Sequence, residues 1–330
     1  GPSSFFYENR GAAFPRVGPA SGATQVQIFS ANSFEACTQG YVCSFTHPAT
    51  NASLYSSPAS PSSTSAIVCT TPDWGSVFPS EFATVTVHRN ISVVHLPSIN
   101  NIKFEFDFSE YVVAAQTTPL TAPASGGTVV SLWGGAFHFG PGSTRSYECR
   151  FASAESSVTA PVTVRSQNQI ECTLPLWPWK AQTVSLTVER FNSTQMQDAV
   201  DFTLTPTVLA LNASSGPAGG GPALRVDGAG FSTDATSLYV CVFRVGAIIV
   251  RAEPVPAVSP LTIVCLLPPW GDTVIESRTL LTLELNGSPT VEAGHFFDFY
   301  AIWTTVHPTQ VVATGGDLLT VTGSGFNIAF

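Results

Sequence analysis

The chain has 330 residues, with 13 basic and 22 acidic side chains and a formal net charge of −9 at pH 7. Only 11% of the residues are charged, against roughly 25% in ordinary soluble domains. This shortage of cations excludes a nucleic-acid partner, whose phosphates need a field of lysine and arginine. No apolar run reaches the roughly 18–20 residues that span a bilayer.

Two short motifs occur three times along the chain, in the same order. One is Tyr-x-Cys-x-Phe, and the other is Ile-x-Cys followed by proline and then tryptophan. The cysteines of these motifs are Cys43, Cys69, Cys149, Cys172, Cys241 and Cys265. Because multi-residue motifs do not recur by accident, they indicate an array of related domains with a period of about 95 residues.

Each unit opens on a glycine-containing turn and closes on a phenylalanine-rich strand that includes Asp-Phe. From these marks we predict the following division of the chain. Residues 1–12 end a preceding repeat, 13–108, 109–204 and 205–301 form repeats 1, 2 and 3, and 302–330 begin a fourth. We therefore expect the chain to be a piece of a longer array.

Alternating apolar residues, such as Val184, Leu186 and Val188, predict half-buried strands between turns rich in Gly, Pro, Asn and Ser. No segment has a sustained helical period. We therefore predict an all-β fold of tandem immunoglobulin-like β-sandwiches. Short connections, such as that from Phe202 to Pro206, predict a stiff and elongated rod.

The repeated cysteines are predicted to pair within each unit, because their strands point both side chains into the core. The predicted disulfides are Cys43–Cys69, Cys149–Cys172 and Cys241–Cys265. Matched pairs suit an oxidising compartment and an extracellular or cell-surface location, with buried free thiols of a cytosolic protein as the alternative. Cys37 is left over, either to cross-link another chain or as a buried or loop thiol.

Five sequons predict N-linked glycans, at Asn51, Asn90, Asn192, Asn212 and Asn286. Three of them, Asn90, Asn192 and Asn286, follow the same strand of successive units and predict a row of glycans along the array. The alternative is that these asparagines are unmodified polar ends of loops.

A stretch rich in serine and proline lies between the first two motif cysteines. We interpret it as an inserted surface loop, either O-glycosylated or bare and flexible. Its candidate residues are Ser57, Pro58, Ser60, Pro61, Ser62, Ser63 and Thr64.

Residues for catalysis are not evident in the sequence. The six histidines are scattered, and the acidic residues form no repeated pair and no calcium-binding loop. We therefore expect no enzyme activity, no catalytic residue, no metal and no cofactor beyond covalent glycans. Trp179 is a candidate sugar-binding platform, although its neighbour Trp177 belongs to the repeated motif.

Together these motifs resemble the IPT/TIG domain, the immunoglobulin-like module of plexins, Met-type receptors, fibrocystin-like proteins and Rel transcription factors. The resemblance rests on turns such as Gly126-Gly127, on strand ends such as Gly230-Phe231, and on the cysteine motifs. Repeat 1 departs from the pattern, because it lacks the double glycine at Gly22. The resemblance implies a β-sandwich with a role in adhesion, receptor scaffolding or DNA binding, and the acidic composition argues against DNA.

The leading hypothesis is a structural extracellular glycoprotein that forms or decorates a fibre or a cell-surface appendage. The alternative is the ectodomain of a cell-surface receptor or adhesin that binds a protein partner. An exposed apolar patch confined to one repeat would favour the alternative. The expected partners are neighbouring copies of the chain or other surface glycoproteins, with no small-molecule substrate and any membrane anchor outside this segment.

Overall fold

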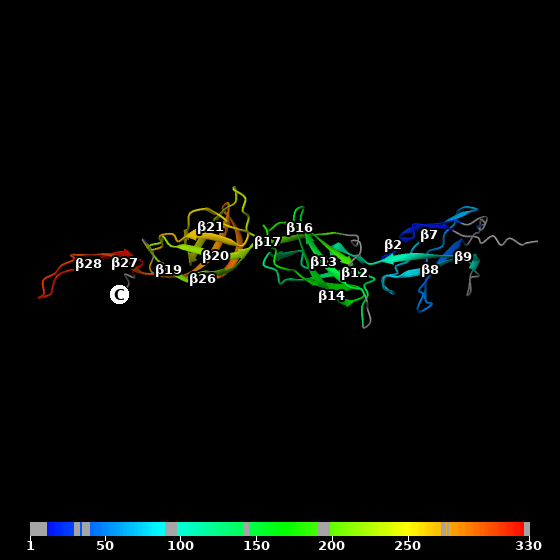
Figure 1. Ribbon diagram of the computed structural model, residues 1–330, viewed down its shortest axis with the longest axis horizontal. Coiled ribbons are helices and arrows are strands. Elements are labelled where there is room, and N and C mark those ends of the chain that lie inside the picture. Colours follow the sequence, from blue (N-terminus) through cyan, green and yellow to red (C-terminus); the bar gives the residue numbers. More distant parts are fainter. Residues whose placement is uncertain are drawn as a thin grey trace, which may run out of the picture.

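The computed structural model describes residues 12–29, 34, 40–89, 98–140, 145–190, 199–271, 275 and 277–326. These residues form an all-β structure with one short 3-10 helix, Ala114–Gln116. Three β-sandwiches follow one another along the long axis of the molecule, and a two-stranded hairpin follows the third (Figure 1). The predicted fold class, tandem immunoglobulin-like sandwiches in an elongated rod, is confirmed.

Repeat 1 is a sandwich of two sheets. The first sheet has the order β1 (Ala12–Phe14), β3 (Gln25–Phe29), β7 (Ala66–Thr70) and β6 (Pro61–Ser63). The second has the order β2 (Val17–Pro19), β9 (Ser98–Ser109), β8 (Phe82–Arg89), β4 (Tyr41–Thr46) and β5 (Ser53–Tyr55).

In repeat 2 the strand β14 pairs with both β13 and β15, so the two layers form one continuous sheet. The order is β10 (Tyr111–Val112), β12 (Val129–Gly135), β15 (Gln169–Thr173), β14 (Ser157–Ser166), β13 (Tyr147–Ala152), β16 (Thr183–Arg190), β17 (Val200–Thr205) and β11 (Thr121–Pro123).

Repeat 3 again has two sheets. One has the order β18 (Thr207–Leu211), β20 (Ala223–Ala229) and β24 (Thr262–Leu266). The other has the order β19 (Ser215–Pro217), β26 (Ser288–Tyr300), β25 (Ser277–Leu285), β21 (Leu238–Val245) and β22 (Ile248–Arg251), with β23 (Val255–Pro256) beside β21. The terminal hairpin consists of β27 (Ile302–His307) and β28 (Thr320–Ser324).

Each repeat has its own hydrophobic core, which follows from the alternation of its strands. The motif tryptophans are the largest side chains in these cores, and they are Trp74, Trp177 and Trp270. Each indole N–H is satisfied by a backbone carbonyl a few residues later, of Pro79, Lys180 and Ile275 respectively. The repeated Trp motif therefore fills the core and also closes a short loop at the end of each sandwich. We call it the Trp loop, and it comprises residues 74–80, 177–181 and, in repeat 3, 270–271 and 275.

The glycine-rich turn has the same geometry in all three repeats. Gly126 and Gly220 have positive φ. A Cβ atom on Gly126 would lie 2.7 Å from the carbonyl carbon of Pro175, and one on Gly220 would lie 2.7 Å from that of Pro268. Gly22 occupies this place in repeat 1, where a Cβ atom would lie 2.6 Å from the carbonyl oxygen of Pro72. Ala23, with φ of 61°, stands where the other repeats have a second glycine. The turn is thus kept in repeat 1 without the double glycine.

Candidate functional site: the joints between repeats

A single residue connects each repeat to the next. Strand β9 ends at Ser109 and β10 begins at Tyr111, and the same spacing separates β17 from β18 and β26 from β27. The connecting residues are Glu110, Pro206 and Ala301. A linker of one residue has almost no conformational freedom, so the contacts around it set the angle between neighbouring repeats.

A buried alanine ties each closing strand to the Trp loop next to the joint. Its N–H donates to the carbonyl of the residue that precedes the linker, and its carbonyl accepts a bond of 2.8 Å from the Trp loop. The alanines are Ala20, Ala124 and Ala218, and none is exposed. Their acceptors are Ser109, Thr205 and Tyr300, at 2.8, 2.8 and 2.9 Å. The end of each sandwich is therefore fixed by backbone bonds that do not depend on side-chain chemistry.

The next repeat completes the core of the repeat before it. Ala136 belongs to repeat 2 by sequence, yet it is fully buried in the core of repeat 1. Ala229, from repeat 3, is fully buried in the core of repeat 2 in the same way. Neighbouring repeats therefore bury apolar surface against each other, which favours one fixed arrangement of the two.

At the joint between repeats 1 and 2, backbone and side-chain bonds cross directly between the domains. The N–H of Ser80 donates to the carbonyl of Ala136 at 2.9 Å, and Nε2 of His138 donates to the carbonyl of Ser80 at 2.8 Å. Nε2 of Gln167 donates to the carbonyl of Gly75 at 3.0 Å. These bonds hold the Trp loop of repeat 1 against two loops of repeat 2.

The side chain of the linker residue Glu110 is completely buried. Four other side chains hydrogen-bond to its carboxylate. The hydroxyls of Ser80 and Tyr147 donate to Oε1 at 2.6 and 3.0 Å. Arg145 bonds to Oε1 at 3.2 Å, and Arg190 donates to Oε2. Since Ser80 comes from repeat 1 and the other three from repeat 2, the carboxylate joins the two domains.

This network explains how a carboxylate stays ionised in a buried place. Burial alone would raise the pKa of Glu110, but the hydrogen bonds from Ser80 and Arg190 outweigh it and hold the pKa below its usual value. Burial and the nearby charge of Glu110 raise the pKa of Tyr147, so its phenol remains a donor. The buried charge is therefore fully paired, as a buried charge must be to avoid a large penalty.

The other two joints have a contact at the equivalent position, but it is formed by different groups. At the second, the N–H of Ala181 donates to the carbonyl of Gly230 at 2.9 Å, and the exposed Lys180 pairs with Asp234 at 3.1 Å. At the third, the N–H of Gly325 donates to the carbonyl of Gly271 at 3.1 Å. Ala136, Gly230 and Gly325 all have positive φ and all precede a phenylalanine. The residue before this phenylalanine thus forms the contact point at every joint.

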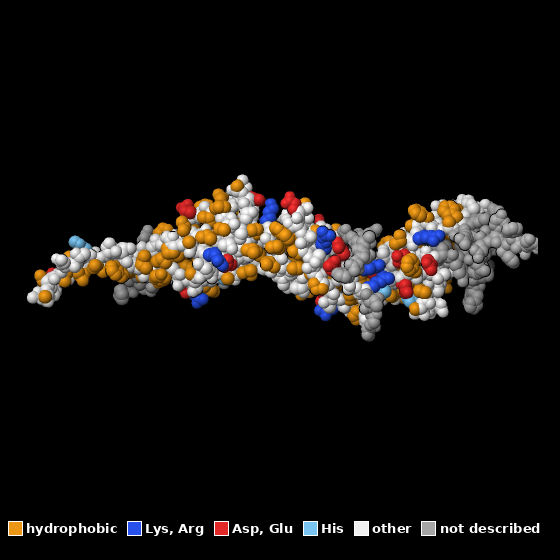
Figure 2. Space-filling model, in the orientation of Figure 1, with side chains coloured by type: hydrophobic (Ala, Val, Ile, Leu, Met, Phe, Trp, Pro, Cys, Tyr) orange, Lys and Arg blue, Asp and Glu red, His pale blue; other side chains and the backbone are white. Residues whose placement is uncertain are grey.

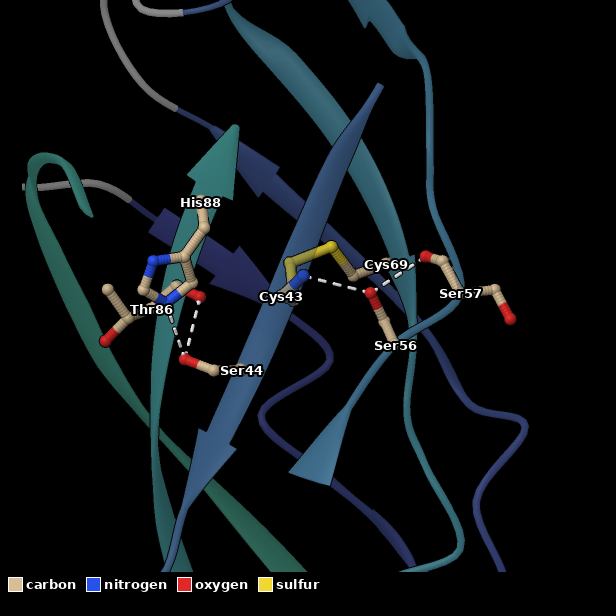
Figure 3. The surroundings of a disulfide bond; sticks show 7 residues. All are labelled: Cys43, Ser44, Ser56, Ser57, Cys69, Thr86 and His88. Carbon is tan, nitrogen blue, oxygen red and sulfur yellow. Dashed lines mark hydrogen bonds between the residues drawn. A yellow bond between two sulfur atoms is a disulfide. The ribbon is translucent and has the colours of Figure 1, made fainter. Parts of the chain in front are cut away.

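The structure joins the motif cysteines within each repeat, in the pairs that their spacing predicts. The disulfides are Cys43–Cys69, Cys149–Cys172 and Cys241–Cys265. Figure 3 shows the first of them, with the N–H of Cys43 donating to the hydroxyl of Ser56 at 2.9 Å. That hydroxyl in turn donates to the carbonyl of Ser57 at 2.9 Å. Cys37 lies outside the described residues.

The stretch rich in serine and proline is strand in part, which corrects the prediction that it is a loop throughout. Ala59 exchanges two backbone bonds of 2.8 Å with Tyr41, and the segment 61–63 forms strand β6 at the edge of the first sheet. Backbone pairing is open to any residue that leaves its N–H and carbonyl groups available, so this composition does not prevent a strand. Several side chains remain exposed, and they are Ser57, Pro58, Ser60, Ser62, Ser63 and Thr64.

Of the predicted glycan acceptors, Asn51, Asn212 and Asn286 lie in the described structure and are exposed. Asn90 and Asn192 lie outside the described residues, so the predicted row is represented only by Asn286. Asn286 and Gly287, both with positive φ, form the tight turn between β25 and β26.

The described residues contain no group of three or more His, Cys, Asp and Glu side chains arranged to hold a metal ion. Among them, too, no helix is long and apolar enough to cross a membrane. His47, which the sequence did not single out, is buried against Trp74 and Phe78 and pairs with Glu81 at 3.0 Å. Trp179 is 37% exposed and packs edge-on against Trp177.

Residues 116–204 match the family model of the IPT/TIG domain. The chain contains an IPT/TIG domain. The match covers most of repeat 2, including both cysteines of its disulfide. The predicted resemblance is therefore confirmed for an IPT/TIG-containing protein.

No curated protein matches the chain. Among solved structures, the plexin A4 extracellular region, domains 1 to 10, is 15% identical, with 96% of this chain and 28% of that chain covered and a TM-score of 0.26. The ICAM-5 D1-D4 ectodomain fragment is 13% identical, with 88% of this chain and 75% of that chain covered and a TM-score of 0.25. The chain spans only 34% and 28% of the two plexin A4 structures. Similarity at this level is no guide to function.

Proposed function

We propose that the chain is a stiff extracellular rod of IPT/TIG repeats in the ectodomain of a cell-surface receptor or adhesin. The observation that carries the proposal is the one-residue linker at each of three successive joints, with direct bonds across it. Such a rod sets the distance and orientation of whatever lies at its ends, and it needs no catalytic residue. The IPT/TIG match supports the receptor or adhesin, since the family resemblance implies receptor scaffolding and adhesion.

The disulfides support the extracellular location. All three repeats have one at equivalent places, and disulfides persist in oxidising compartments. Each closes a loop of 23 to 26 residues, which is worth about 3 kcal/mol in the chain-entropy model. The repeats therefore combine small size with resistance to unfolding outside the cell.

A structural fibre or appendage is the second candidate, and the recurring joint favours it. The same alanine, Trp loop and contact point appear at each of the three joints. A backbone arrangement that recurs at the same place from unit to unit is typical of an open-ended linear array. Exposed large hydrophobic side chains are found on all three repeats, so no single repeat is marked as a binding surface for a protein partner. In a structural fibre or appendage, the partners are neighbouring copies of the chain or other surface glycoproteins.

The test is small-angle scattering and negative-stain electron microscopy of the full chain, secreted from eukaryotic cells and kept unreduced. Strand β26 has 13 residues and, at about 3.3 Å per residue, gives a repeat length of about 40 Å. We expect straight rods in which three sandwiches span about 120 Å. A broad distribution of bends at the joints would contradict the rod. End-to-end or lateral association as concentration rises supports the fibre, and isolated rods at all concentrations support the receptor or adhesin.

A further inference from the structure

Asn212 lies at the edge of repeat 3. It follows β18 directly, where the chain leaves one sheet for the other, and β19 begins three residues later. Its N–H donates to the carbonyl of Arg225 at 3.0 Å, and its Oδ1 accepts a bond of 2.8 Å from the N–H of the same residue. One asparagine thus satisfies both backbone groups of Arg225, using its main chain for one and its side chain for the other.

This pairing decides which atom of the side chain is available. A carboxamide is planar, and its oxygen and nitrogen lie on opposite sides of Cγ. Oδ1 is occupied by the N–H of Arg225, which leaves Nδ2 as the available atom, and no described residue hydrogen-bonds to it. The residue is exposed. Nδ2 is the atom that carries the sugar in an N-linked glycan.

The serine of the sequon contributes only its backbone to the described structure. Ser214 is exposed, and within the described structure its hydroxyl makes no hydrogen bond. Only its carbonyl is used, as the acceptor of the N–H of Asp298 at 2.9 Å. The hydroxyl that completes Asn-x-Ser is therefore free for recognition by a glycosylating enzyme.

The surface of repeat 3 also favours a hydrated group. Hydrophobic side chains cover much of the visible face of repeat 3 in Figure 2, and charged side chains on it are few. Leu209, on the strand that leads to Asn212, is 53% exposed. Exposed apolar surface of this kind promotes aggregation unless something covers it.

We propose that Asn212 is an N-glycosylation site whose glycan leaves repeat 3 in a fixed direction. The proposal rests on the extracellular location in the proposed function, because the modification takes place in the secretory pathway. The donor is a lipid-diphosphate-linked oligosaccharide. A bond forms between Nδ2 and C1 of the first sugar as the C1–oxygen bond to the diphosphate breaks. Nδ2 loses one proton, and the lipid diphosphate leaves with the bonding electrons.

The other described sequons provide internal comparisons. Oδ1 of Asn286 also accepts a bond, from the N–H of Leu238 at 3.0 Å. Asn286 lies in a left-handed turn, however, and Pro289 follows its sequon, so the turn alone accounts for an asparagine at this position. Asn51 is exposed, and no described residue hydrogen-bonds to its side chain. A glycan on Asn51 would therefore be loosely oriented, unlike one on Asn212.

The occupancy test uses the full chain secreted from eukaryotic cells. Digestion with peptide N-glycosidase in heavy-oxygen water converts each glycosylated asparagine to a labelled aspartate, which peptide mass spectrometry locates. We expect the label at Asn212 in the wild type and in the control S215A, and its complete loss in S214A, which leaves Asn212 itself in place. Unlabelled Asn212 in secreted, disulfide-bonded protein overturns the site. Failure of secretion, or free motif cysteines, contradicts the extracellular function instead.

The orientation is tested by hydrogen exchange at the amide of Arg225. We expect equally slow exchange in glycosylated wild type and in unglycosylated S214A, because both keep the bond from Arg225 to Oδ1. In N212A, which lacks Oδ1, exchange at this amide should be at least tenfold faster. If glycosylated wild type exchanges as fast as N212A, the glycan root is not held and the fixed direction is wrong.

Discussion

Replacing Glu110 with glutamine tests whether the buried carboxylate holds repeats 1 and 2 together. Glutamine keeps the size of the side chain and one acceptor oxygen, but its amide group faces Arg190 where Oε2 stood. Hydrogen bonds to charged groups contribute about 1.5–3 kcal/mol each, and removing one member of a buried ion pair costs about 3–5 kcal/mol. Arg145 and Arg190 are 29% and 31% exposed and regain some hydration. We therefore expect a loss near the lower limit, about 3 kcal/mol.

Calorimetry and scattering of the full chain provide the readout. In the E110Q variant the unfolding transition of repeats 1 and 2 should move to lower temperature, and the angle between them should become more variable. The joint between repeats 2 and 3 should not change. The control is E155Q, at an exposed glutamate of repeat 2, with an effect within about 0.5 kcal/mol. An E110Q chain with unchanged transitions and unchanged scattering would show that the carboxylate has no net effect on the joint.

The same network makes the joint sensitive to acid. Because the pKa of Glu110 is lower in the folded chain than in the unfolded chain, the unfolded state binds the proton more readily. The carboxylate therefore stabilises the joint above its ordinary pKa of about 4.3, and this contribution is lost as the pH falls from there through the lower, folded pKa. Wild type should lose stability below about pH 4, and E110Q should lack this part of the loss.

Three further predictions concern the other contacts. The double variant C149A/C172A should destabilise repeat 2 by about 3 kcal/mol in urea denaturation, and an unchanged midpoint would contradict a disulfide that constrains the unfolded chain. G230A should destabilise the second joint by about 2–4 kcal/mol, because its new Cβ would lie 2.8 Å from that of Ala124. The control is G246A, which is also at positive φ but has no neighbouring atom within 4 Å. It should destabilise the chain by only about 1 kcal/mol. K180A should change stability by less than about 1 kcal/mol at any salt concentration, since its pair with Asp234 is exposed, and a larger effect would assign that ion pair a role in the joint.

The sequence predicted the sandwiches and the cysteine pairs because their signals are local and repeated. Tyr-x-Cys-x-Phe places its three named side chains on one face of a strand, and this follows from two-residue alternation alone. The joints were not predicted, because their partners are far apart in the chain. Ser80 and Arg190 lie 30 and 80 residues from Glu110, and nothing near Glu110 in the sequence distinguishes it from an exposed acid.

The linker residues also carry no common sequence signal. Glu110, Pro206 and Ala301 differ in charge and size, yet they occupy the same place. The backbone bonds of the buried alanine and the Trp loop are common to the three joints, and they do not require the same linker side chain at each. Strand β6 was missed for a related reason, since composition predicted a loop where backbone pairing makes an edge strand.

The burial of Ala136 and Ala229 in the core of the preceding repeat gives the array a direction. Repeats 1 and 2 each bury an alanine of the repeat that follows, so the two ends of such an array are chemically different. The last unit in line lacks a successor and needs a dedicated cap of another kind. Duplicating a whole unit would lengthen the array without altering these contacts, whereas inserting one residue at position 110 or 206 would disrupt one of them. Growth by whole units is thus the change in length that this architecture tolerates best.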